Sequence, residues 1–95
     1  MPRHRYLVAY DIRDEHRLPR VAKIVERYGD RIQFSVFCCE LSKADLADLR
    51  VELQQVIDTG QDRVLFVDLG RPESTVPINI LGQQRPWPRS GPHVV

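Results

Sequence analysis

The feature that most restricts the fold of this chain is the order in which short apolar runs alternate with segments of helical periodicity. A continuous apolar run is typical of a buried strand, and apolar residues recurring every three or four positions are typical of a helix. These patterns predict, in chain order, a strand at 6–10, a helix from about 18 to 28, two strands within 30–41, a helix at about 43–57, a strand at 64–67 and a weaker strand at 76–81.

Particular residues mark the expected boundaries. Pro19 places the start of the regular first helix near Leu18, because proline beyond the first turn removes a hydrogen bond, and Gly29 follows where a C-terminal cap would lie. A kink near Ser35 separates the two strands within 30–41, which together are too long for one ordinary strand. Ser42 and Asp45 have the spacing of a capping box at the start of the second helix.

The element order is that of an α+β fold, a ferredoxin-like βαββαβ sandwich with an extra C-terminal strand. Both helices would cover one face of an antiparallel sheet. Since the strands at 6–10 and 64–67 are apolar on both sides, a second copy is expected to cover the other face, giving a sheet-to-sheet homodimer. Pro77 confines the last strand to an edge or to pairing outside the monomer. We expect residues 1–82 to form the ferredoxin-like domain and residues 83–95 a flexible Pro-rich tail.

The overall composition gives no indication of a partner, because the formal net charge of the 95 residues is only +1. Any argument for nucleic acid must therefore come from the arrangement of charges. Cys38 and Cys39 are adjacent, which suits neither a spaced metal site nor a disulfide framework and favours a reducing compartment. The apolar run at 6–10 is too short for a signal peptide or a membrane span. We expect a cytoplasmic protein that is not bound to membranes.

Asp11 is the first candidate functional residue, because it ends a predicted buried strand at the rim of the sheet. The alternative is a turn or cap residue, a role that Asp14 could share. Mg²⁺ prefers oxygen ligands and is usually held by one or two carboxylates. One carboxylate is little for a metal site, but two copies of Asp11 facing each other across a dimer axis would suffice. Such a metal could activate water against a phosphodiester without a histidine base.

A stripe of cations is the second candidate. The successive spacings are four, three, three and four residues, so the cations share a face wherever the segment is helical. A solvated cationic surface is the usual explanation, but acids are scarce on this stripe and arginine suits phosphate geometry. Binding to the nucleic-acid backbone would be salt-sensitive and weakly sequence-selective. The cationic stripe comprises Arg13, Arg17, Arg20, Lys23 and Arg27, and Arg31 could extend it.

Taken together, Tyr10-Asp11-Ile12, Arg17, Lys23 and the run from Tyr28 to Phe37 resemble the CRISPR-associated protein 2 family. The resemblance covers about residues 6–70. It implies a ferredoxin-like homodimer whose Asp11 side chains meet near the two-fold axis and bind Mg²⁺ between them. Members of the family are described as metal-dependent endonucleases acting on RNA or double-stranded DNA. They are also described as the centre of the spacer-capturing complex with the CRISPR-associated protein 1 integrase.

In that complex the dimer would be a scaffold that holds duplex DNA between integrase subunits, and cleavage would not be needed. The resemblance also places Tyr10, Arg31 and Phe37 around the Asp11 pair, while Ser35 is expected to shape the kinked strand. Departures are Cys38, where the family often has glutamate, Pro19 in the first helix, and the tail with Trp87. Two other hypotheses stay open: a free-standing ribonuclease of toxin type with the same dimeric fold, and a binding domain without chemistry.

Overall fold

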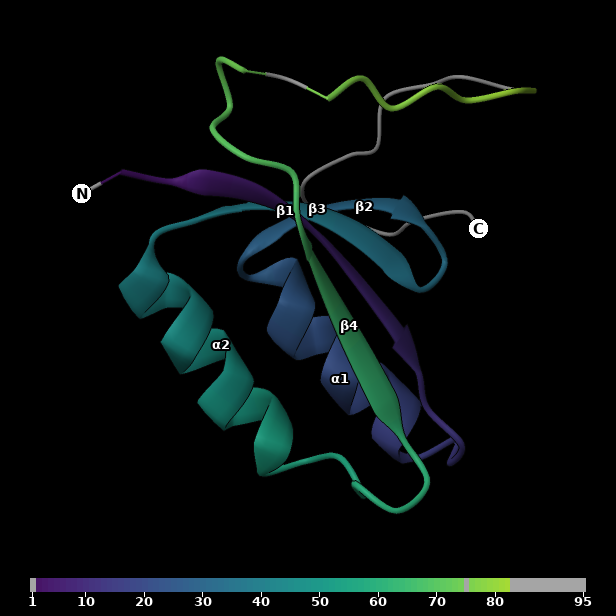
Figure 1. Cartoon of the computed structure of the whole chain (residues 1–95). Helices are drawn as coiled ribbons and strands as arrows, with labels where there is room; N and C mark the ends of the chain where they lie inside the picture. Colours follow the sequence, from purple (N-terminus) through teal and green to yellow (C-terminus); the bar gives the residue numbers. More distant parts are fainter. Residues whose placement is uncertain (1, 75, 83–95) are drawn as a thin grey trace.

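The computed structural model describes residues 2–74 and 76–82 and has six regular elements. Four antiparallel strands form one sheet in the order β2-β3-β1-β4, and the two helices lie on the same face of it (Figure 1). This arrangement confirms the α+β, ferredoxin-like prediction. The elements are β1 (His4–Asp11), α1 (Arg17–Glu26), β2 (Gly29–Gln33), β3 (Val36–Leu41), α2 (Lys43–Gln54) and β4 (Arg63–Asp68).

Local side-chain chemistry explains where both helices begin. At α2 the Ser42 hydroxyl accepts a hydrogen bond from the Asp45 backbone N–H at 3.1 Å, and Asp45 Oδ2 accepts from the Ser42 N–H at 3.2 Å. This is the predicted capping box. At α1 the Asp14 carboxylate accepts from the Arg17 backbone N–H at 3.1 Å. Pro19 therefore falls in the first turn, where its missing N–H leaves no helical bond unmade.

The two faces of β1 have different surroundings, because successive strand residues point to opposite sides of the sheet. Tyr6, Val8 and Tyr10 are buried against the helices, and Val8 is 0% exposed. Leu7 and Ala9 point to the other face. There their cross-strand partners Val67 and Leu65 are 46% and 51% exposed. The single chain thus has one complete core and one apolar sheet face that it leaves open. Further buried core residues are Val21, Val25, Phe37, Cys39, Leu41, Leu49 and Leu53.

Gly29 serves a different purpose from the predicted helix cap. Arg27 is the C-terminal cap of α1, and Gly29 is already the first residue of β2. A Cβ atom at Gly29 would overlap the Cys38 carbonyl oxygen and the Cys39 sulfur atom and lie 2.7 Å from Cys39 Cα. Glycine is thus required by the close approach of β2 to β3.

The predicted strand at 76–81 is corrected within the single chain, where residues 76–82 form no strand. The chain stays beside β1 as far as Gly70, whose carbonyl accepts from the Arg5 N–H at 2.8 Å. Gly70 then adopts a φ of 88°, which turns the backbone away from the sheet. Residues 78–81 and Val36 help to line a cavity of about 270 Å³ beside β2 and β3. Pairing of this segment with a second copy stays a prediction.

No helix in the described part of the chain is long and apolar enough to span a membrane. The expectation of a flexible tail at 83–95, with Trp87, concerns residues that lie outside the described ranges.

Candidate metal and nucleic-acid site at the end of β1

Asp11 is the last residue of β1 and lies on the open face of the sheet. Its side chain is 71% exposed, and Arg13 Nη1 lies 3.9 Å from Asp11 Oδ2. In the antiparallel register Asp11 stands directly opposite Arg63, just as Ala9 stands opposite Leu65. The carboxylate therefore occupies the rim of the apolar face, with solvent on one side and the sheet on the other.

One chain alone does not offer Mg²⁺ a site. Among residues 2–74 and 76–82 there is no group of three or more histidine, cysteine, aspartate or glutamate side chains that could hold a metal ion. Asp11 contributes one carboxylate, and the residues placed beside it by contact and by register are the cations Arg13 and Arg63. The donor set would fit a metal only if a second carboxylate came from another copy across the open face.

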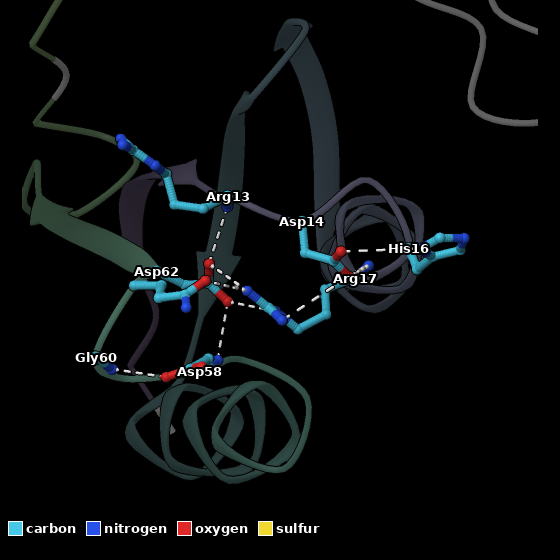
Figure 2. A network of polar contacts seen from close by, with 8 residues as sticks. Arg13, Asp14, His16, Arg17, Asp58, Gly60 and Asp62 are labelled. Carbon is cyan, nitrogen blue, oxygen red and sulfur yellow. Dashed lines mark hydrogen bonds and ion pairs between the residues drawn. The ribbon is translucent and has the colours of Figure 1, made fainter.

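Asp62 is the centre of a network that fixes the loop following Asp11 (Figure 2). Its side chain is 0% exposed. It accepts from the Arg13 backbone N–H at 2.9 Å, from Arg17 Nε at 2.7 Å and from the Asp58 backbone N–H at 2.8 Å. These hydrogen bonds join Asp62 to Arg17 and Arg13, which lie 45 and 49 positions earlier in the sequence. The turn between α2 and β4 thus holds the loop between β1 and α1 in place.

The charge of Asp62 is strongly favoured by these contacts. The hydrogen bond from the Arg17 guanidinium, followed by those from the backbone N–H groups of Arg13 and Asp58, holds the pKa of the Asp62 carboxyl far below its usual range, although burial acts in the opposite direction. A charge-assisted contact of this kind is stronger than a neutral hydrogen bond. Asp62 therefore stays ionised at pH values that would protonate a solvent-exposed aspartate.

The cationic stripe is divided by the structure. Arg17 is directed at Asp62 and is only 22% exposed, and Arg27 forms an ion pair with Glu52 on α2. Arg13 precedes the helix and lies beside Asp11. Arg20 and Lys23 are exposed, and neither forms an ion pair within the described ranges. Of the predicted set, these two are the cations that α1 presents to solvent without an acidic partner.

Glu52 ties the end of α1 to α2 through two neighbouring side chains. It accepts hydrogen bonds from the Arg27 guanidinium and from the Tyr28 hydroxyl. Bonding to the carboxylate raises the pKa of Tyr28 to about 12, with burial as the second cause. Arg27 thus contributes to the packing of the two helices, and its charge is partly neutralised there.

The residues expected around Asp11 lie on the opposite face of the sheet. Tyr10 and Phe37 stack with ring centroids 6.1 Å apart, and the Arg31 guanidinium carbon lies 5.2 Å from the Phe37 ring centre. Tyr10, Lys23 and Arg31 help to line a cavity of about 310 Å³ between α1 and the β2–β3 turn. Burial raises the pKa of Tyr10, an effect that Arg31 partly opposes. Tyr10, Arg31 and Phe37 are therefore brought together, but apart from the Asp11 carboxylate.

Ser35 and the two cysteines belong to the β2–β3 hairpin. The Ser35 carbonyl accepts from the Tyr10 backbone N–H at 3.1 Å, and Ser35 lies in the turn that separates β2 from β3, where the sequence predicted a kink. Cys39 is buried, and burial raises the pKa of its thiol to about 12. Cys38 lies on the open face of the sheet, opposite Leu7.

Sequence reasoning missed Asp62 and Arg63. The sequence pattern predicts a helix to about residue 57 and a strand from residue 64 and singles out no residue between them, although functional side chains are common in such loops. Arg63 gains its importance only from the register that sets it opposite Asp11. No local pattern gives that register.

Comparison with known proteins gives consistent relatives. The family model described as CRISPR associated protein Cas2 matches residues 4–75. The CRISPR-associated endoribonuclease Cas2 of Geobacter sulfurreducens is 34% identical over 78% of this chain and 78% of its own length. The CRISPR-associated endonuclease Cas2 2 of Thermus thermophilus is 44% identical over 65% of this chain and 69% of its own. The crystal structure of Streptococcus pyogenes Cas2 superposes with a TM-score of 0.66 and 34% identity, covering 79% of this chain and 99% of that one.

Proposed function

This chain belongs to the family of CRISPR associated protein Cas2, and from that premise we propose that it is an adaptation protein. It binds duplex DNA as a homodimer and bridges subunits of the CRISPR-associated protein 1 integrase during spacer acquisition. It also acts as a Mg²⁺-dependent endonuclease on RNA or double-stranded DNA. The place of action is the cytoplasm. The observation that carries the proposal is the exposed Asp11 carboxylate at the rim of an apolar face, with Arg13 beside it.

The homodimer is supported by the open face of the sheet. Leu65 and Val67 are about half exposed there, and Leu7 and Ala9 lie beside them. Exposed apolar side chains gathered on one face are typical of a protein–protein interface. A two-fold axis through this face would use the same patch on both copies. If the axis passes near the end of β1, it also brings the two Asp11 residues to one seam, which supplies the second carboxylate that a metal needs.

Each proposed site residue has a separate part in this function. The two Asp11 carboxylates would hold Mg²⁺, which when bound lowers the pKa of a water molecule and neutralises charge on a phosphodiester. Arg20 and Lys23 would contact phosphates of the duplex, and Arg13 would do so beside Asp11. Arg17 and Arg27 form ion pairs with Asp62 and Glu52, so they would hold the binding surface in position. Arg31, together with Tyr10 and Phe37, would keep the end of β1 rigid. Ser35 would keep the neighbouring turn rigid.

Replacement of Asp11 by asparagine tests the proposal, because it removes the carboxylate charge while preserving the shape of the side chain. We expect Asp11→Asn to lose at least about 100-fold in Mg²⁺-dependent cleavage of RNA or duplex DNA, since the substitution removes both carboxylates of the metal site. Spacer capture with the integrase should be unchanged. Cleavage is measured with labelled substrates with and without Mg²⁺, and capture by integration of labelled spacers.

Asp48→Asn is the matched control, because Asp48 is an exposed aspartate on α2 that forms no ion pair among the described residues. It should leave both readouts at the wild-type level. Cleavage that survives Asp11→Asn would contradict the metal site. Failure of the wild-type protein to support capture by its cognate integrase would contradict the adaptation role.

A free-standing ribonuclease of toxin type is the second candidate function. It is favoured by the name endoribonuclease carried by the Geobacter sulfurreducens relative. Under this alternative, Asp11-dependent cleavage of RNA would occur, and the integrase would neither bind the protein nor need it. The same pair of assays therefore separates the two functions.

A further inference from the structure

Arg63 lies beside Asp11 in the sheet, although the two residues are far apart in the sequence. It is the first residue of β4 and stands directly opposite Asp11 in the register with β1. Residues directly opposite in an antiparallel pair have Cβ atoms about 5 Å apart on the same face of the sheet. Arg63 and Asp11 are therefore side by side at the rim of the open face.

Arg13 reaches the same carboxylate from the loop that follows β1. Its backbone is fixed by Asp62, and Figure 2 shows its side chain pointing away from Asp62, whereas Arg17 points toward it. The Arg13 guanidinium lies 3.9 Å from Asp11. Two arginines from separate segments thus stand near one carboxylate.

The Arg63 guanidinium is not used by the single chain. Arg63 is exposed, and within residues 2–74 and 76–82 it forms no ion pair, not even with Asp11. A cation held beside a carboxylate without pairing to it is available for an anion. Its neighbour Asp62 is locked by Arg17 and by backbone N–H groups, so the start of β4 is held in a fixed position.

We propose that Arg63, together with Arg13, forms a phosphodiester-binding site around Asp11. This inference rests on the proposed function and names the groups that bring the substrate to the carboxylate. Asp11 by itself would repel a phosphate. Two guanidinium groups offset that repulsion and offer paired N–H donors that match the oxygens of a phosphate. The site belongs to the rim of the sheet, where a nucleic-acid backbone can reach it without entering the apolar face.

The proposal is tested with Arg63→Gln and a mixed-sequence DNA duplex carrying a fluorescent label, in EDTA so that no metal contributes. We expect affinity to fall about 10-fold or more, the range of one charge-assisted hydrogen bond. The slope of log K against log salt concentration should flatten by about one per protomer, as expected when one phosphate contact is lost. Because Arg63 is exposed, its substitution should leave thermal unfolding nearly unchanged.

Arg71→Gln is the matched control, since it removes the same charge from an exposed arginine beyond the opposite end of β4. It should keep the wild-type affinity and slope. The alternative is that Arg63 serves only assembly, through an ion pair with Asp11 of a second copy. Sedimentation velocity distinguishes the two, because the proposal requires Arg63→Gln to remain a dimer.

An Arg63→Gln protein that binds the duplex like Arg71→Gln would overturn the inference and leave the proposed function intact. Loss of the dimer in Arg63→Gln would also overturn it, in favour of an interchain ion pair. If the wild-type protein bound no duplex at any salt concentration, the proposed DNA-binding role would fail first, and the inference with it.

Discussion

At the scale of single residues, the carboxylates of Asp11 and Asp62 have opposite surroundings. Asp11 is 71% exposed with one loose cationic contact, whereas the Asp62 side chain is 0% exposed and saturated with donors. Asp11 is therefore suited to bind a ligand from solution, and Asp62 is suited to hold the loop that follows Asp11. Sequence reasoning identified Asp11 because it ends an apolar run. It did not identify Asp62, because the partners of Asp62 are 45 and 49 residues away.

Asp62→Asn should destabilise the protein in a way that depends on pH. The folded-state pKa of Asp62 lies below its unfolded value of about 4, so its contribution is present above that value and is lost as the pH falls through the folded pKa. At neutral pH we expect the variant to melt several degrees below the wild type. The difference should shrink steadily below about pH 4.

Thermal unfolding followed by circular dichroism at several pH values provides the measurement. Asp48→Asn, at an exposed position on α2, should show a small difference that does not vary in this way. An Asp62→Asn deficit that was equal at acidic and neutral pH would mean that shape, and not charge, is what the site requires.

At the scale of elements, the apolar pattern of α1 predicted the helix, whereas its cationic pattern did not predict where each charge points. The apolar spacing correctly predicted the helix and its core side at Val21 and Val25. The cationic spacing predicted one shared face, but successive helical residues are about 100° apart, so Arg17 and Arg20 differ by about 60° in direction. That rotation turns Arg17 toward Asp62, which no local pattern could reveal. The capping box at α2 was predictable because both of its partners lie within one turn.

The double substitution Arg20→Glu with Lys23→Glu tests the outer face of α1. Since both cations are exposed and without acidic partners in the described part of the chain, they are free to contact phosphates. We expect duplex affinity to fall about 10-fold or more for every sequence tested, with a salt slope flattened by about two per protomer.

Lys43→Glu with Arg50→Glu makes the same change of charge on α2 and should have little effect on binding. Fluorescence anisotropy over a salt series measures both variants. Equal losses in the two would show that net charge decides the affinity, and would return the α1 cations to an ordinary solvated surface.

At the scale of the whole molecule, the open sheet face was predictable from the sequence because β1 and β4 are apolar at consecutive positions. What covers that face is not determined by the single chain, which leaves Leu65 and Val67 half exposed. The pairing of residues 76–82 is not determined by the single chain either, because they form no strand in its sheet. The fold was therefore predictable nearly throughout, while the homodimer stays a proposal because its contacts lie between chains.

Leu65→Asp should disrupt the proposed homodimer. It would place a charge on each side of the proposed seam and remove two apolar side chains from burial, which predicts at least about 100-fold weaker association. Sedimentation velocity at micromolar concentration checks this. Val51→Asp is the control, because Val51 is 53% exposed on α2 and lies away from the sheet. A Leu65→Asp protein that sedimented like Val51→Asp would exclude the open face as the interface.

The alternating environment of β1 has a consequence for changes in chain length. Deleting or inserting one residue in this strand would exchange its two sides, because the side-chain direction repeats every two residues. The aromatic and aliphatic side chains now packed under the helices would turn outward, and Asp11 would point inward among them. The number of residues between the start of β1 and Asp11 is thus as strict a requirement as the aspartate itself, and indels here should be tolerated only in pairs.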